Sequence, residues 1–262
     1  MSRITEIPLR HNPDFTILAE TGDYIVVDKP APLLIHPSVP GNPPTLLDGL
    51  RALLAYDIAN GAALSIINRL DRETSGVVLV AKNKETARNL SLAMQKRRVE
   101  KEYVALVHGK PKHRRFTISV PILRAGLVEK SEIWVKQIPH PDGSPCCTHF
   151  EILECLGEFT LMRVSPQTGR MHQIRVHAKQ AGLPIVGDKI YGPDENCYLE
   201  FIVTGWTEQL AARLLMPRQA LHCRRMAIPE FGEWQAKLPQ EFEHLLTADC
   251  PSPNVPPASK EQ

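Results

Sequence analysis

The hydrophobic positions along the chain follow two kinds of pattern. Short apolar runs at 24–27, 76–81 and 102–109 have the length of strands, and the second is almost wholly apolar and rich in β-branched residues. Residues 45–54 repeat their apolar positions with helical spacing, and Asn83 is a suitable N-cap for a second helix over 84–97. Segments 150–156 and 158–166 predict a hairpin that turns at Gly157. Interspersed strands and helices predict a mixed α/β or α+β fold.

The same pattern bears on domain organisation. No boundary is evident between residues 15 and 245, so we expect one domain there, preceded by an extension over 1–14. Residues 38–44 are rich in Pro and Gly, which predicts a loop. Residues 246–262 are rich in Pro and Ser and have little apolar surface to bury, which predicts a disordered tail.

Composition narrows the functional classes. With 262 residues and 43% hydrophobic content, the chain can bury a substantial core without disulfides or metal. The net charge of +2 does not by itself indicate a nucleic-acid binder. Evidence for nucleic-acid binding must therefore come from local clusters of positively charged residues. The six cysteines form no CxxC pair, which favours a reduced, cytoplasmic protein. There is no apolar run of membrane-spanning length and no secretory signal.

The stretch INRLDRETSGVVLVAK places several charges immediately before a buried strand. Asp71 lies on the loop that leads into this strand, and loops positioned by a rigid sheet often carry catalytic groups. A carboxylate there has a raised pKa unless a cation compensates for its burial, and Arg69 and Arg72 are nearby in sequence. A polar hairpin in which Asp71 accepts hydrogen bonds from the backbone is the alternative.

A second charged stretch runs from Ser165 to Gly192. A helix over 171–181 is predicted, with Gly182 as its left-handed stop. On this helix His172, Arg175 and Lys179 share one face, while the apolar residues share another, and Arg170 precedes it. Such a cationic stripe suits a carboxylate or phosphate partner, although a solvated amphipathic helix has the same pattern.

A basic cluster precedes the strand at 102–109. Lys96, Arg97, Arg98 and Lys101 lie close to Tyr103. Cations beside an aromatic ring can bind phosphates while the ring stacks on a base. Alternatively, Tyr103 fills a strand position and the cations keep the surface soluble.

A metal site is a further alternative. Cys146, Cys147, His149 and Cys155 fall within a short span, but zinc sites rarely use adjacent cysteines. We expect these to be strand residues and no metal to be bound.

Taken together, the motifs resemble those of a known family. NRLDRETSGVVLVAK, KEYVALVHG, TGRMHQIRVHAKQAGLPIVGDKIYG and RQALHC resemble, in order, the signatures of RluA-type pseudouridine synthases. The upstream ILAETGDYIVVDKPAPLLIHP is similar to that family's first strand and loop, so the resemblance extends from about residue 17 to 239. It implies a catalytic domain over 15–245 with a mixed, largely antiparallel sheet and a basic cleft.

The resemblance also implies a chemistry. The family isomerises selected uridines in RNA to pseudouridine without a metal or organic cofactor. Its essential aspartate falls on Asp71, which acts at C1′ of the sugar, at C6 of the base, or in loss of the 2′ proton. Its partner arginine falls on Arg175, which we expect to hold Asp71 in a bidentate pair. Its tyrosine falls on Tyr103, which stacks on the uracil and is a candidate to accept the C5 proton.

The remaining expectations concern RNA. The target base must be flipped out of its stack, and Arg69 matches a family arginine that enters the vacated space. Phosphate or base contacts are expected from Arg170, His172, Lys179 and Lys101. The partner implied is RNA (tRNA or rRNA), with no membrane and no obligatory protein partner, and we expect a monomer. A non-catalytic RNA-binding module on the same fold is the alternative, although binding alone would not require Asp71, Tyr103 and Arg175 together.

Several features depart from the family's usual pattern. Asn68 stands where His is common, Met171 replaces Thr or Ser, and Pro32 follows KPA where Gly is usual. Because Asn68 is not the nucleophile, we expect activity to survive. We also expect no small S4-type RNA-binding domain, so that the catalytic domain itself selects the RNA.

Overall fold

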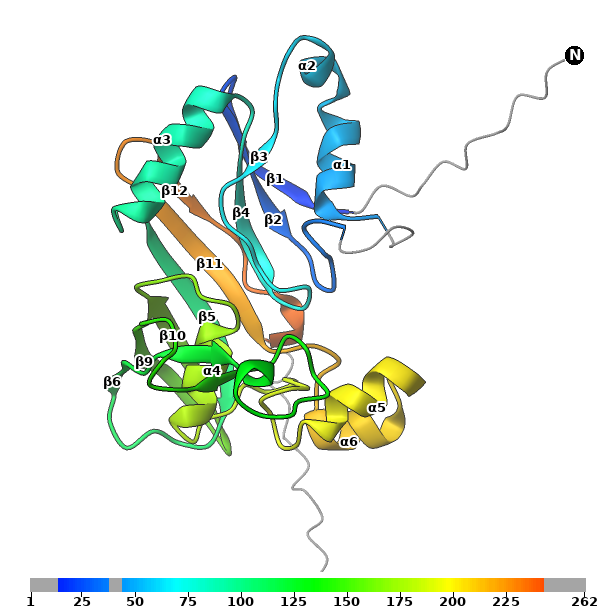
Figure 1. Cartoon of the computed structure of the whole chain (residues 1–262), viewed down its shortest axis with the longest axis vertical. Coiled ribbons are helices and arrows are strands. Elements are labelled where there is room, and N and C mark those ends of the chain that lie inside the picture. Colours follow the sequence, from blue (N-terminus) through cyan, green and yellow to red (C-terminus); the bar gives the residue numbers. More distant parts are fainter. Residues whose placement is uncertain (1–13, 38–43, 243–262) are drawn as a thin grey trace, which may run out of the picture.

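The computed structural model describes residues 14–37 and 44–242. This part of the chain forms a ten-stranded sheet, helices packed against it and a separate two-stranded ribbon (Figure 1). The strands are β1 Thr16–Glu20, β2 Tyr24–Lys29, β3 Ser65–Ile66, β4 Ser75–Ala81, β5 Glu100–His108, β6 Arg115–Ile118, β7 Ile122–Arg124, β8 Gln137–Pro139, β9 Thr148–Leu156, β10 Phe159–Pro166, β11 Leu221–Ile228 and β12 Gly232–Gln235. The helices are α1 Leu46–Leu53, α2 Ala55–Ala59, α3 Lys84–Gln95, the 3-10 turn η1 Ala125–Leu127, α4 Gln173–Gln180, α5 Asn196–Thr204 and α6 Glu208–Leu214.

The sheet is mixed and mostly antiparallel, as expected from the sequence. Its main path runs β1-β2-β4-β11-β5-β10-β9-β6, with β3 added to β4 and β12 added to β11. Of the strand pairs in the described residues, β4 and β11 alone are parallel. Strands from the two ends of the chain therefore meet in the middle of the sheet, where β11 crosses between β4 and β5.

Gly76 makes this central crossing possible. It lies opposite Cys223 in the parallel register, and its φ of +114° is one that L residues rarely adopt. A Cβ at this position would lie 2.2 Å from the carbonyl oxygen of Cys223. The glycine therefore lets the backbones of β4 and β11 approach directly after the loop that carries Asp71.

We predict that Gly76→Ala destabilises the protein by about 3 kcal/mol or more, because strain at positive φ adds to a backbone clash. Urea unfolding followed by circular dichroism measures the effect. Gly157→Ala is the control, since Gly157 also has a positive φ (+56°) but a Cβ there meets nothing within 4 Å. Equal loss in the two variants would show that the close approach to Cys223 contributes nothing.

Local signals account for several helices and strands. Thr45 caps α1 in a reciprocal capping box with Asp48, and the side chain of Asn83 accepts a hydrogen bond from Thr86 N at 2.8 Å to cap α3. Every residue of β4 is buried, as its apolar run predicted. The predicted hairpin is β9–β10, and the strand predicted over 102–109 is β5, with ends that differ by up to two residues.

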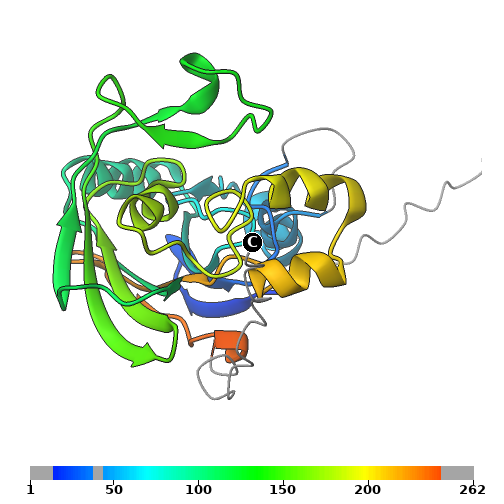
Figure 2. The same cartoon turned by 90° about the horizontal axis from the view of Figure 1, so that it is seen from below.

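The predicted helix over 171–181 is α4, which ends before Gly182 at φ +73°. The expectation that one face packs and the other offers cations is wrong, because six consecutive residues from Gln173 to Ala178 are buried. Figure 2 gives the reason: α4 lies between the sheet and the green β7–β8 ribbon, so both of its faces are covered. Lys179 follows the buried run and is exposed.

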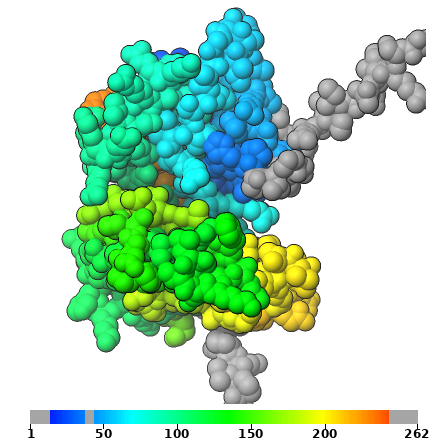
Figure 3. Space-filling view, in the orientation of Figure 1, coloured from blue at the N-terminus to red at the C-terminus, as the bar shows by residue number. Residues whose placement is uncertain are grey.

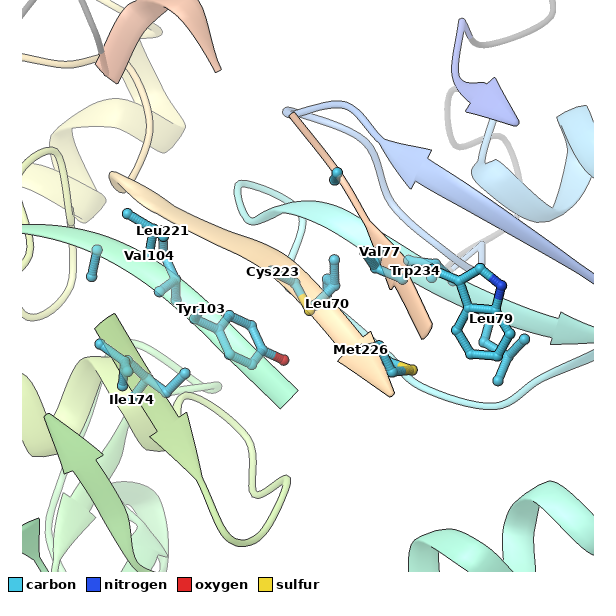
Figure 4. Packing of buried hydrophobic residues seen from close by; sticks show 14 of the residues in the cluster. Leu70, Val77, Leu79, Tyr103, Val104, Ile174, Leu221, Cys223, Met226 and Trp234 are labelled. Carbon is cyan, nitrogen blue, oxygen red and sulfur yellow. The ribbon is translucent and has the colours of Figure 1, made fainter. Parts of the chain in front are cut away.

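The apolar core runs through the centre of the sheet and joins the two halves of the molecule. Figure 4 shows Tyr103 of β5 beside Leu221 and Cys223 of β11, with Leu70 from the loop before β4 close to them. In Figure 3 the N-terminal half, from blue to teal, lies above the green and yellow C-terminal half. Most of the buried apolar residues thus belong to one cluster, and two smaller clusters lie beside it.

Some expectations fall on residues that lie outside the described ranges. They are the tail over 246–262, the extension over 1–14 apart from its last residue, and the loop over 38–44 apart from its last residue. Among the described residues, no helix has the length and apolar character needed to cross a membrane.

Candidate active site

The loop before β4 is held by two buried polar side chains. Asn68 donates through Nδ2 to the carbonyl of Val77 at 3.0 Å and accepts from the backbone N–H of Leu79 at 2.9 Å. Lys29 donates through Nζ to Leu33 O at 2.9 Å and to Arg72 O at 3.3 Å. Because both ends of the loop are fixed to the sheet, the position of the intervening Asp71 is set by the backbone.

Asp71 forms an ion pair with Arg175, which is 104 residues away in sequence. Nη1 of Arg175 donates to Oδ2 of Asp71 at 2.9 Å. The expected bidentate pair between them is wrong, because Nε and Nη2 of Arg175 donate instead to the two oxygens of Asp188, at 2.6 and 2.8 Å. Asp188 has a fully buried side chain, and its Oδ1 also accepts the backbone N–H groups of Ile190 and Tyr191 at 3.0 Å. A second, buried carboxylate therefore orients the arginine that holds Asp71.

The hydrogen bonds to Asp71 fall on one of its two oxygens. Besides Arg175, Gln219 donates to Oδ2 at 3.4 Å, and Nε2 of His172 lies 3.9 Å from the same atom. Gln219 is itself held by Thr74, to whose Oγ1 it donates at 2.7 Å. Oδ1 of Asp71 has no hydrogen-bond partner among the described residues, and the side chain is 30% exposed. The anchored oxygen fixes the carboxylate, and Oδ1 remains available to a substrate.

The electrostatics keep Asp71 ionised. Burial alone would raise the pKa of its carboxyl, but His172, Arg175 and the hydrogen bonds from Arg175 and Gln219 hold that pKa below its usual value. His172 is neutral at pH 7, because burial and the nearby Arg175 lower its pKa to about 4. At neutral pH the positive charge next to Asp71 therefore comes from Arg175. The sequence suggested that His172 adds to a cationic stripe, but the neutral imidazole carries no such charge.

Asp71 opens onto a cavity of about 730 Å³ between the two halves of the molecule. That volume is enough for a nucleotide-sized ligand. Positively charged side chains and histidines gather on its lining: His36, Arg69, Arg72, Arg97, Lys101, Arg170, His172 and Arg175. The cleft is basic, as expected.

The structure places seven of the eight predicted site residues around this cavity. Asp71, Tyr103, Arg175, Arg69, Arg170, His172 and Lys101 line it. Lys179 is outside the lining and donates instead to the carbonyl of Gly192 at 3.2 Å. It lies one turn beyond Arg175 on α4, where the helix has passed the cavity.

Tyr103 forms part of the cavity wall and is 8% exposed. Burial and a hydrogen bond with the thiol of Cys223 raise the pKa of its hydroxyl well above the usual value. A general base should have a pKa near the working pH, so a buried neutral phenol is poorly suited to accept a proton. Its ring remains available for stacking on a base.

We predict that Tyr103→Phe retains turnover within about ten-fold of the wild type, because the ring stays and the lost hydroxyl is not a base. Tyr103→Ala, which also removes the ring, should lose far more. Single-turnover rates at saturating enzyme measure both. A Phe variant as slow as the Ala variant would assign the hydroxyl a direct part in the chemistry.

The cysteine-rich segment does not form a cluster. Sγ of Cys146 donates to Val120 O at 3.2 Å, while His149 on β9 pairs with Thr117 and Gln167 at 2.7 and 2.8 Å. Within residues 14–37 and 44–242, no group of three His, Cys, Asp or Glu side chains is arranged to hold a metal ion. Thr148, His149 and Cys155 lie on β9, as predicted, but the expectation that Cys146 and Cys147 are strand residues is wrong, because both precede β9.

Comparison with known families decides the assignment. The model of the family described as RNA pseudouridylate synthase matches residues 23–180, more than half of the chain. The chain belongs to the RNA pseudouridylate synthase family. The matched range contains Asp71, Tyr103 and Arg175, and the RluA-type resemblance drawn from the motifs is confirmed.

Individual relatives of the family agree. An uncharacterized RNA pseudouridine synthase of Chloroflexus aurantiacus is 37% identical over 84% of this chain and 64% of its own length. Ribosomal large subunit pseudouridine synthase D of Pseudomonas aeruginosa is 36% identical over 89% of this chain and 71% of its own length. The chain thus spans about two thirds of the length of these relatives.

Solved structures in the family have the same fold. Human RNA pseudouridylate synthase domain containing 4 superposes with a TM-score of 0.68 at 26% identity, covering 87% of this chain and 90% of the other. Human RNA pseudouridylate synthase domain containing 1 gives a TM-score of 0.66 at 27% identity, covering 89% and 86%.

Sequence reasoning missed three residues that shape this pseudouridylate synthase site. Asp188 and Tyr191 stand in the quoted segment VGDKIYG and Gln219 in RQALHC, but none was singled out. A signal for Asp188 was present, because an acidic residue in an apolar segment must find a cation if it is buried. No local pattern identifies Gln219, whose partners lie 145 and 148 residues away.

Proposed function

We propose that this chain converts a uridine of large-subunit ribosomal RNA to pseudouridine, with Asp71 as the reacting carboxylate. The observation that carries the proposal is the state of Asp71. It is ionised, its Oδ2 is held by Arg175, its Oδ1 has no hydrogen-bond partner among the described residues, and the residue lines a basic cavity with an aromatic wall. Among the two RNAs expected from the sequence, rRNA is favoured because several relatives are named ribosomal large subunit pseudouridine synthase D.

The reaction requires the N1–C1′ bond to break and C5 of the uracil to join C1′. Oδ1 of Asp71 would attack C1′ or C6, or assist loss of the 2′ proton, and each route needs the carboxylate to be ionised. Arg175 supports that state by lowering the pKa of Asp71. The site thus supplies the same starting oxygen for all three routes.

The reacting atoms of a uridine are covered by its neighbours in a stacked helix, so the target uridine is proposed to flip out of its stack into the cavity at a cost of a few kcal/mol. Arg69 is exposed at the cavity and follows the fixed Asn68, a position from which it can enter the space that the base leaves. Lys101 on β5 and Arg170 before α4 also line the cavity, and they are proposed to bind phosphates on either side of the flipped nucleotide. Lys179, which lies outside the lining, has no part in this arrangement.

The test uses ribosomal RNA and, separately, bulk tRNA that carry tritium at C5 of uracil. Incubation with the wild-type protein is expected to release tritium from the rRNA, and sequencing of the product to locate the modified position. Release from the tRNA alone would assign the other substrate class. An RNA-binding module without catalysis would retard both RNAs in a gel and release tritium from neither.

The expected monomeric state and the cytoplasmic location stay predictions. The cysteines of the described part are all free.

A further inference from the structure

The hydroxyl of Tyr191 links the ribbon to the active site. Oη lies 2.8 Å from the backbone N of Gln137 on β8 and 2.8 Å from Nδ1 of His172. The tyrosine ring also lies over the guanidinium of Arg175, with 5.0 Å between Cζ and the ring centroid. Tyr191 is 4% exposed and the side chain of His172 8%, so water does not substitute freely for these partners.

The donors around Oη determine which ring nitrogen of His172 carries the proton. The backbone N–H of Gln137 can only donate, so Oη accepts from it. The hydroxyl proton of Tyr191 then needs an acceptor, and Nδ1 of His172 is the one present among the described residues. If Nδ1 carried the proton instead, the buried hydroxyl would have no acceptor, which is costly.

With Nδ1 accepting, the neutral imidazole carries its proton on Nε2. That atom lies 3.9 Å from Oδ2 of Asp71, and His172 lines the cavity. The backbone of His172 is left-handed, with φ +55° and ψ +14°, which is uncommon for a residue with a side chain. Such conformations persist where the surroundings fix them and they concentrate at functional sites.

We propose that Tyr191 is a positioning residue for the reaction proposed above, on which this inference rests. Its hydroxyl fixes His172 as the Nε2–H tautomer, so that a neutral donor lies near Oδ2 of Asp71, the same oxygen that accepts from Arg175 and Gln219. We expect the 3.9 Å separation to shorten when substrate binds, because hydrogen bonds at catalytic sites often tighten on binding. The backbone N–H of Gln137 donates to Oη of Tyr191 and thereby directs the hydroxyl proton towards Nδ1 of His172. The β7–β8 ribbon thus contributes to the geometry at Asp71.

The first test is Tyr191→Phe, which keeps the ring over Arg175 and removes only the hydroxyl. We expect kcat to fall about ten-fold with KM unchanged, because Asp71 loses a positioning contact and the RNA-binding surface is untouched. Tyr198→Phe is the matched control: it packs against the same apolar cluster, and its hydroxyl has no hydrogen-bond partner among the described residues. An unchanged kcat in Tyr191→Phe, or an equal fall in both variants, would overturn the proposal.

The second test reads the tautomer directly. Long-range nitrogen–proton NMR correlations of His172 in the free wild-type protein are expected to show Nε2–H, and a mixture of tautomers in Tyr191→Phe. A wild-type spectrum with the proton on Nδ1 refutes the proposal even if the enzyme is fully active. If no RNA is modified, the proposed function fails, while this spectrum still decides the tautomer.

Amide substitutions give a third, independent readout. His172→Gln can place an N–H₂ donor near the position of Nε2, whereas His172→Asn can place it only near Nδ1. Asn tolerates left-handed backbone better than Gln, so a backbone effect would favour the Asn variant. We expect the Gln variant to retain the higher kcat, and the reverse order would contradict a donor role at Nε2.

Discussion

Replacing Asp71 with Asn is expected to lower the rate of pseudouridine formation by at least about 10⁴-fold, since an amide is neither a nucleophile nor a base. Folding should survive, because the amide oxygen still accepts from Nη1 of Arg175, and Arg175 keeps its two bonds to Asp188. RNA affinity should also survive, since the cavity keeps its cations. Tritium release and a gel-retardation titration on the same RNA separate the two properties.

The control for this prediction is Glu154→Gln. Glu154 is an exposed carboxylate on β9 that does not line the cavity, and its replacement makes the same change of charge. Wild-type turnover in this variant would show that charge alone does not explain the loss. Substantial turnover in Asp71→Asn would remove Asp71 from the chemistry and leave the fold assignment intact.

The second large effect concerns stability. Arg175→Met should destabilise the protein by about 3–5 kcal/mol, because it leaves a buried charge without its partner. Asp188 has no solvent exposure, and Arg175 outweighs the effect of burial to hold the pKa of Asp188 below its usual value. Without the arginine, Asp188 must either stay ionised in a dry site or take up a proton. Urea unfolding at pH 7 measures the loss.

This result would differ from the expectation based on sequence, in which Arg175 served chiefly to hold Asp71. Arg213→Met is the control, because Arg213 also bridges two carboxylates, Asp194 and Glu200, but with a side chain that is 37% exposed. Its replacement should cost no more than about 1 kcal/mol. If Arg175→Met were as mild as this control, the role of Arg175 would be confined to catalysis.

A double variant sharpens the assignment. Arg175→Met leaves the buried carboxylate of Asp188 without its cation. Adding Asp188→Asn removes that negative charge, so the double variant should recover part of the lost stability. The two single effects then fail to add, as expected for groups joined by hydrogen bonds of 2.6 and 2.8 Å. Strict additivity would indicate that Asp188 is held by its backbone donors alone.

The sequence located the parts of the site that depend on local pattern. The buried run at β4 and the charges before it identified the loop of Asp71, and Gly182 correctly marked the end of α4. Short strands such as β1, β6 and β12 were not predicted, because strands of four or five residues are too short to show a clear alternation of apolar and polar positions. Helix α5 was missed because its segment NCYLEFIVT contains aromatic and β-branched residues that favour strands.

What the sequence by itself determined is the family and the order of the main elements, and it proposed Asp71, Tyr103 and Arg175 as site residues, which the structure places around one cavity. Only the tertiary structure decided how those residues are held: that the arginine fork belongs to Asp188, that Gln219 supports Oδ2 of Asp71, and that both faces of α4 are covered. The physical reason is that burial and hydrogen-bond geometry arise where separate segments meet in the folded chain, 13 residues apart for Arg175 and Asp188 and 148 residues apart for Asp71 and Gln219. From sequence alone, a charged residue on a helix face is expected to be exposed to solvent. Whether another element covers that face, as β8 covers α4, is known only from the tertiary structure.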